Sequence, residues 1–264
     1  MSRQTFNFLL YLLSTVWFPG FYFKSLHKFL TMKQLLFCCF VLAVFSSCDQ
    51  RTGSGNIITE KRQTGNFTGI KVGGAFEVEM KSGPVTEVVV ESDDNIIKYI
   101  DTKVSGDVLE IRTNHSMGFS NAHYKVFITA PEINSIDVSG AANVKAKDPL
   151  KSSGKISFEI SGAGEVNASV DAPEVEADIS GAGNMELTGR TRNYKAKITG
   201  SGDLKSGDLQ SENTEVDVSG AGSAKVHASV SLKAEASGAG NISYKGGASV
   251  QQKTSGAGTI KSDN

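Results

Sequence analysis

Three histidines follow residue 50, and their side chains are suited to metal binding or acid–base chemistry. His115 and His123 share the segment "NHSMGFSNAHY", whereas His227 lies between Val226 and Ala228. A zinc site needs closer spacing, or cysteine and carboxylate ligands beside such a pair. We therefore interpret His115 and His123 as exposed loop residues and His227 as a surface residue.

Acidic residues recur at similar spacing further along the chain, beginning with Asp137, Glu159 and Asp178. Carboxylates of this kind could form a glycosidase pair or hold a cation. Each occupies the same place in a repeated pattern and none departs from it, so we interpret them as a solvated face. The sequence has no P-loop, dinucleotide-binding or HExxH context. We predict no catalytic residue, no cofactor and no metal site; a polysaccharide-active enzyme is the least favoured alternative.

All three cysteines, Cys38, Cys39 and Cys48, lie near the start of the chain. From Met32 the sequence reads "MKQLLFCCFVLAVFSSCDQ", with a basic residue, an apolar stretch and small residues before Cys48. This segment resembles a bacterial lipoprotein signal with its lipobox, which implies that Cys48 becomes the lipidated first residue of the mature chain. Residues 32–47 are then the signal peptide, and residues 48–56 a flexible tether.

The first 31 residues contain a second apolar stretch, "FNFLLYLLSTVWFPGFYF", which is about long enough to span a bilayer. Pro19 and Gly20 interrupt it, and a complete signal follows it. We expect that Met32 is the true start. The alternative is that residues 1–31 form an additional hydrophobic segment.

A short phrase, Ser-Gly-Ala-Gly in its clearest copies, recurs through the second half of the chain, with copies 18 to 22 residues apart. Such a fixed period is typical of stacked repeats and is too short for a strand–helix–strand unit, which needs about 30 residues. The hydroxyl residues that begin the copies are Ser139, Ser161, Ser180, Thr199, Ser219, Ser237 and Ser255.

Residue types alternate around each hydroxyl. The positions one and three before it, and five after it, are apolar in nearly every copy, as in Ile179, Ala177 and Met185. The position two before it is always charged, as in Asp178. This alternation predicts strands with one buried face. We therefore predict an all-β fold, a parallel β-helix or solenoid with about 18–22 residues per coil, in which equivalent strands pair about 4.8 Å apart.

The repeated phrase falls between a strand and the next inward residue, so we interpret it as a corner. Glycine accepts positive φ, and small side chains allow corners to stack. A calcium-binding nonapeptide coil would need an aspartate where Val166 and Met185 stand. The predicted structural corners are Ser161, Gly162, Gly164, Ser180, Gly181, Gly183, Ser219, Gly220, Gly222, Ser237, Gly238, Gly240, Ser255, Gly256 and Gly258.

Residues 57–135 are strand-like but less regular, and we assign them to the same domain as the repeats at 136–264. Residues 105–107 predict a hairpin turn. Residues 93–100 predict a short helix capped by Asp93 or Asp94. This region should form wider opening coils or a small sheet that covers the N-terminal end of the stack.

The span 57–262 resembles the family named putative auto-transporter adhesin head domain, or GIN domain. The segment "FEVEMKSGPVTEVVVESDDNIIKYIDTKVSGDVLEIRT" and the recurring glycine corners carry this resemblance. It implies a right-handed β-helix on a bacterial envelope lipoprotein, and it brings no catalytic residues.

The net charge of −1 and the lack of a basic cluster argue against a nucleic-acid partner. We expect a non-catalytic, outer-membrane lipoprotein, anchored through Cys48, whose rigid surface binds a glycan or a protein. The resemblance to envelope lipoproteins implies that surface export is associated with an acidic tract after the lipidated cysteine. The segment "DQRTGSGN" after Cys48 is not such a tract, so the periplasmic face is favoured over the cell surface. The alternative is a structural element that self-associates through the ends of its stack, for example as a homodimer.

Overall fold

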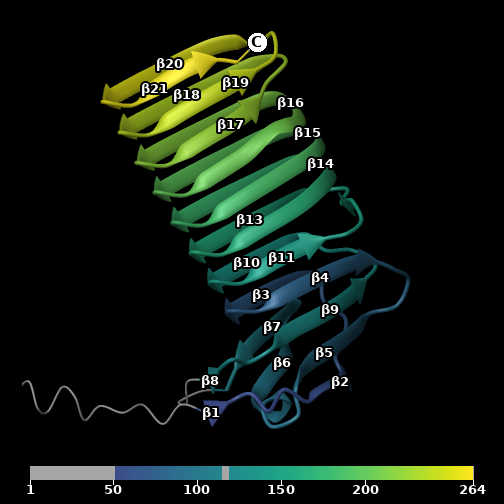
Figure 1. Ribbon diagram of the computed structural model, residues 1–264. Helices are drawn as coiled ribbons and strands as arrows, with labels where there is room; N and C mark the ends of the chain where they lie inside the picture. Colours follow the sequence, from purple (N-terminus) through teal and green to yellow (C-terminus); the bar gives the residue numbers. More distant parts are fainter. Residues whose placement is uncertain (1–50, 115–118, 264) are drawn as a thin grey trace, which may run out of the picture. The chain divides into compact units, whose positions relative to one another are not determined.

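Most of the chain forms one stack of parallel strands, which confirms the predicted β-solenoid (Figure 1). The computed structural model describes residues 51–114 and 119–263. The repeat region contains β10 (Ser135–Gly140), β11 (Asn143–Ala146), β12 (Leu150–Lys151), β13 (Lys155–Gly162), β14 (Glu165–Gly181), β15 (Asn184–Gly200), β16 (Asp203–Gly220), β17 (Ser223–His227), β18 (Ser231–Gly238), β19 (Asn241–Lys245), β20 (Ser249–Gly256) and β21 (Thr259–Ser262).

Each coil contributes one strand segment to each of two sheets. The pre-corner sheet contains residues 135–140 and their equivalents, and the post-corner sheet contains residues 143–146 and their equivalents. In β14, residues 165–172 lie in the post-corner sheet and residues 174–181 in the pre-corner sheet. The alternation of buried and exposed residues is interrupted once between these two segments, where Pro173 and Glu174 are two consecutive exposed residues. This interruption marks a second bend, the return corner.

The register follows the spacing of the repeated phrase. Ser161 pairs with Ser180, Ser180 with Thr199, and Thr199 with Ser219. The pairing continues from Ser219 through Ser237 to the last copy. Equivalent residues of successive coils therefore lie beside one another.

The two sheets bury their apolar columns against each other. Ile160, Ile179, Ile198 and Val218 are each 0% exposed and stack directly in the pre-corner sheet. Burial of this kind is worth about 1.5–3 kcal/mol for each large aliphatic side chain.

The two glycines of a corner serve different purposes. Gly181 has φ +128°, and a Cβ there would lie 2.5 Å from the carbonyl oxygen of Gly162 in the preceding corner. Gly183 is buried, and a Cβ there would lie 2.5 Å from Cγ2 of Ile160. The backbone N–H of Ala182 donates to the Gly162 carbonyl at 2.8 Å, so the hydrogen-bond ladder continues through the bend.

The structure contains a further copy of the corner that the repeat alignment omitted. β3 (Gly69–Gly74) pairs with β10, and β4 (Glu77–Ser82) pairs with β11, in the same register as the other coils. Gly73 occupies the hydroxyl position, while Val72 and Val78 occupy the expected apolar positions. The apolar columns fit this copy, but it lacks the hydroxyl, and Phe76 occupies the place of the second corner glycine.

The N-terminal end of the stack is covered by a less regular β region, as predicted. β7 and β9 continue the two sheets beyond β3 and β4, and then β6, β5 and β2 add antiparallel strands. The elements are β1 (Arg51–Thr52), β2 (Ile57–Arg62), β5 (Glu87–Asp93), the 3₁₀ helix η1 (Ile97–Tyr99), β6 (Ile100–Ser105), β7 (Val108–Thr113), β8 (Phe119–Ser120) and β9 (Tyr124–Ala130).

Two expectations for this region differ from the structure. The helix expected over residues 93–100 is wrong, because β5 extends through Asp93 and only η1 is helical, without a side-chain cap. The flexible tether is also wrong for residues 51–56, since β1 pairs with β8. The hairpin turn at residues 105–107 is confirmed, with Gly106 at φ +65° between β6 and β7.

Asp93 explains both differences. Its buried carboxylate binds residues 51–56 to the less regular β region at the N-terminal end of the stack, which we call the cap. It accepts hydrogen bonds from the backbone N–H of Gly55 at 2.7 Å and of His123 at 2.9 Å. Asp94 beside it accepts from Ser54 and from Asn56. The hydrogen bond from the His123 N–H is the main cause that lowers the pKa of Asp93.

No helix within the described ranges is long and apolar enough to cross a membrane.

We expect Gly181→Ala to lower the free energy of unfolding by roughly 2 kcal/mol or more, because the backbone conformation is unsuitable and the added methyl meets a carbonyl oxygen. Gly154→Ala is the matched control, since a Cβ there would meet nothing within 4 Å and φ is not in the positive range. Chemical denaturation of both variants measures the difference. Equal stability of the two variants would contradict the stacked-corner explanation.

We expect the pH dependence of stability to contain a contribution from Asp93. Because its folded pKa is lowered, the ionised carboxylate stabilises the fold fully above the unfolded pKa of about 3.9. That contribution is lost as the pH falls through the lower folded pKa. Asp93→Asn should therefore be less stable than the wild type at pH 7, with a smaller deficit at pH 3. Denaturation midpoints at both pH values test this, and a deficit that does not shrink in acid would contradict it.

Candidate functional site

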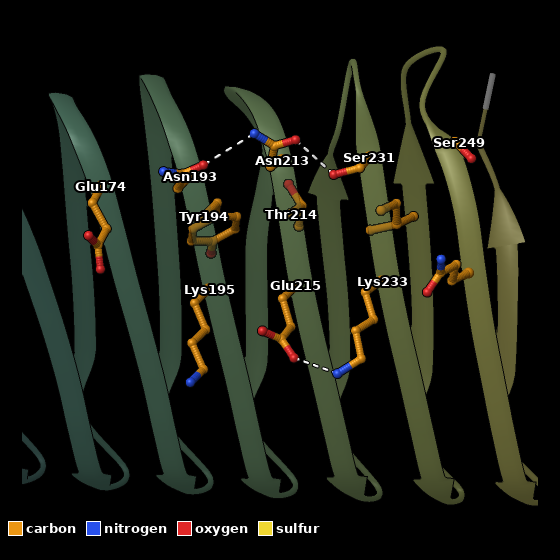
Figure 2. A pocket seen from close by; sticks show the side chains of 12 residues that line it. Glu174, Asn193, Tyr194, Lys195, Asn213, Thr214, Glu215, Ser231, Lys233 and Ser249 are labelled. Carbon is orange, nitrogen blue, oxygen red and sulfur yellow. Dashed lines mark hydrogen bonds and ion pairs between the residues drawn. The ribbon is translucent and has the colours of Figure 1, made fainter.

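A groove of about 520 Å³ opens along the pre-corner sheet, close to the return corners (Figure 2). We call it the polar groove. It is built from five neighbouring coils, and its lining comes from three successive positions of the repeat. The lining residues are Glu174, Asn193, Tyr194, Lys195, Asn213, Thr214, Glu215, Ser231, Leu232, Lys233, Ser249 and Gln251.

The first position forms a ladder of amides and hydroxyls beside the return corner. The Ser231 hydroxyl donates to Oδ1 of Asn213 at 2.8 Å, and Nδ2 of Asn213 donates to Oδ1 of Asn193 at 3.2 Å (Figure 2). Strand pairing places these three residues side by side. Only Oδ1 of Asn193 is used in this ladder. Both hydrogens of its Nδ2 therefore remain available to a molecule outside the chain.

The charged position alternates in sign across the coils. Glu215 accepts from Nζ of Lys233 at 2.7 Å, and this hydrogen bond is the main cause that lowers the pKa of Glu215. Glu176, on the other side of Lys195, pairs with Lys155 at 2.9 Å. Lys195 thus lies between two carboxylates that already have partners, and its ammonium lowers the pKa of both only through space, with no side-chain hydrogen bond or close ion pair to another described residue.

The inward position beneath the groove carries polar side chains where other coils have aliphatic ones. Tyr194 is buried, and its hydroxyl donates to Oγ of Ser206 at 3.0 Å. Ser206 in turn donates to the Lys225 carbonyl at 2.9 Å. Burial is the main cause that raises the pKa of Tyr194.

This interior contact lies beside a bulge in β16. The register between β15 and β16 shifts between Glu186 and Thr188, and Ser206 turns into the core at 0% exposure. In the pre-corner part of β16, Thr214 donates to the His227 carbonyl at 2.7 Å. These contacts fix the strands on which the groove residues stand.

The groove residues were not predicted from the sequence. The apolar positions that define the repeat lie one and three before the hydroxyl, whereas Tyr194 and Thr214 lie five before it. Read along that position, the residues are Val175, Tyr194, Thr214, Leu232 and Val250. Thr214 departs from the apolar type there, and that departure was the available signal.

The described residues that the sequence singled out lie elsewhere. The predicted corners form the opposite edge of the pre-corner sheet from the groove. Asp137, Glu159 and Asp178 align on the outer face of that sheet, where Asp137 pairs with Lys71 at 2.5 Å. Its hydrogen bond to Lys71 is the main cause that raises the pKa of this lysine.

The structure corrects the interpretation of two histidines. His123 is half-buried, and its Nε2 lies 2.8 Å from Oε1 of Glu91. His227 is half-buried too, and its Nδ1 accepts a hydrogen bond from the backbone N–H of Ser211 at 3.3 Å. His115 and Cys48 lie outside the described residues.

The lining of the groove can donate and accept hydrogen bonds at many points along its length. The Glu174 carboxylate makes no hydrogen bond and no close ion pair to another described residue. Across residues 51–114 and 119–263, no three His, Cys, Asp or Glu side chains gather closely enough to hold a metal ion.

The fold resembles several solved structures. A "putative adhesin" from Bacteroides fragilis is 24% identical, with a TM-score of 0.75 over 80% of this chain and 99% of that chain. A "putative adhesin" from Parabacteroides distasonis is 26% identical, with a TM-score of 0.66 over 81% and 100%. A "putative lipid binding protein" from Parabacteroides distasonis is 22% identical, with a TM-score of 0.68 over 81% and 100%. A search of curated proteins finds no match.

The sequence itself matches a family over residues 66–248, a span that begins just before β3 and ends just before β20. This span contains the polar groove except for Ser249 and Gln251, and every corner before the last coil. The resemblance noted from the glycine corners is thereby confirmed. The chain belongs to the family described as "Putative auto-transporter adhesin, head GIN domain".

Proposed function

We propose that this chain is a non-catalytic, adhesin-like module of the bacterial cell envelope, which offers the outer face of a rigid solenoid to a binding partner. The polar groove is the observation that carries this proposal. Its side chains are held by cross-coil hydrogen bonds, and it is open to solvent along five coils. Solenoids commonly use such extended faces for recognition. The family and the neighbouring structures named as adhesins support the same role.

The lining of the groove favours recognition over catalysis. Its two carboxylates, Glu174 on β14 and Glu215 on β16, are separated by the coil of β15, and Glu215 is already paired with Lys233. Neither has a histidine beside it among the lining residues. A general acid and base pair needs two titrating groups directed at one reacting atom.

We further propose that Cys48 carries a lipid that anchors the module to the outer membrane. Arg51, the first described residue, follows it closely and belongs to β1, at the end of the stack that carries the cap (Figure 1). The groove lies on β14 to β20, toward the other end of the stack (Figure 1). An anchor at Cys48 would therefore hold the cap near the membrane and leave the groove away from it.

We expect Cys48→Ala to move the protein from the membrane fraction to the soluble fraction, because the thiol that receives the lipid is absent. Cys39→Ala is the matched control and should stay in the membrane fraction, since it keeps the lipidated residue. Cell fractionation with immunoblotting measures both. A Cys48→Ala variant that stays membrane-bound would contradict lipid anchoring and would favour residues 1–31 as the anchor.

An adhesin-like role requires the solenoid to be exposed outside the cell, in place of the periplasmic face that the segment after Cys48 favours. We expect a protease added to intact cells to digest the wild-type chain while a periplasmic marker protein stays intact. Immunoblotting before and after treatment measures this. Complete protection of the chain, with digestion only after the outer membrane is permeabilised, would place it in the periplasm and overturn the adhesin-like role.

A further inference from the structure

Several polar side-chain groups in the groove make no hydrogen bond and no close ion pair within the described protein, and they point to a ligand rich in hydroxyl groups. The Glu174 carboxylate accepts hydrogen bonds, the Lys195 ammonium donates them, and Nδ2 of Asn193 keeps its donors available. Glu174, Asn193 and Asn213 occupy the same position on successive coils, which lie about 4.8 Å apart. A chain molecule with repeated hydroxyl groups can meet such a series at several points.

The lining argues against an apolar ligand. Its two large apolar side chains, Tyr194 and Leu232, are 2% and 1% exposed, and so they offer little surface to a lipid chain. Protein interfaces usually centre on exposed aromatic or aliphatic anchors. The twelve lining residues present none of these to solvent.

The charges of the lining also argue against a polyanion. Glu174 and Glu215 balance Lys195 and Lys233, so the lining carries no net charge. Polyanions such as nucleic acids bind chiefly through an excess of cationic side chains. A balanced set of charges can still donate and accept hydrogen bonds with neutral hydroxyl groups.

The groove is organised before any ligand arrives. Asn213 is held from both sides, by Ser231 and by Asn193, and Glu215 is held by Lys233 (Figure 2). Side chains that are already ordered lose less conformational entropy on binding. This order favours a specific ligand over diffuse surface contact.

We propose that the polar groove binds an uncharged glycan chain. Asn193, Glu174 and Lys195 contact its hydroxyl groups, and the held Asn213 and Glu215 orient them. This assignment rests on the proposed role as an adhesin-like module, and it adds the class of ligand and the place where that ligand binds.

Binding of the full chain, purified in detergent, to an array of neutral, carboxylated and sulfated glycans tests the proposal. We expect the wild type to bind one or more neutral glycans and to bind no acidic glycan more tightly. Asn193→Ala and Lys195→Gln should each weaken that binding about tenfold, as expected for loss of one hydrogen bond to the ligand. Both side chains are exposed, so their unfolding midpoints should match that of the wild type.

Asn184→Ala is the matched control, because Asn184 is an exposed asparagine on the same strand, β15, but lies outside the groove. It should bind as the wild type does. If Asn193→Ala loses stability as well as binding, the site is judged on Lys195→Gln, because the Lys195 side chain makes no hydrogen bond and no close ion pair within the described protein.

The outcomes separate the ligand from the role. Unchanged binding by both groove variants would overturn the site. Preference for sulfated or carboxylated glycans would overturn the uncharged class. Absence of binding to every neutral glycan, for a chain that protease digests on intact cells, would overturn the glycan ligand while the adhesin-like role stands. Protection from protease would overturn that role, whatever the array shows.

Discussion

The close approach of successive corners is the constraint on which the structure depends. Backbone hydrogen bonds hold each corner on the one before it, with Ala182 donating to Gly162 at 2.8 Å. At this separation there is no room for a side chain on the inner bend, which is why glycine is required at Gly181. Because the ladder runs through the bend, the N–H groups of Ala182 and Asn184 are satisfied by the preceding corner. The coil closes in few residues, and the two sheets come close enough to share one apolar interior.

In-register stacking also determines the outer surface. Any side chain placed outward in one coil lies beside its equivalent in the next, so outward residues meet as ladders of like or alternating type. The amide ladder of Asn193 and Asn213 and the ion pair of Glu215 with Lys233 both arise in this way. The surface chemistry of the groove is thus a consequence of the same repeat that builds the core. The return corners that lie beside the groove are free to vary in length.

The sequence predicted the repeat geometry well because each coil reports on the same physical environment. Ile160, Ile179 and Ile198 fall in one column of the alignment and in one buried stack of the structure. Where no repetition helps, local propensity was misleading. Asp93 was expected to cap a helix, but it is instead drawn into the core by N–H donors from residues distant in the sequence. The groove was missed for a different reason, since its polar inward residues Tyr194 and Thr214 lie at a repeat position that was not compared.

The position of β3 and β4 separates the order of the chain from the order of the stack. This coil precedes β7 and β9 in the sequence, yet it lies between them and β10 and β11 in space. Elsewhere in the stack, each coil needs only the coil made just before it. The coil of β3 and β4 is different, because the strands that pair with it on both sides follow it in the sequence and are synthesised later. The slow step of folding should therefore be closure of the cap around β3 and β4, after which the remaining coils can add one by one with short loops to close.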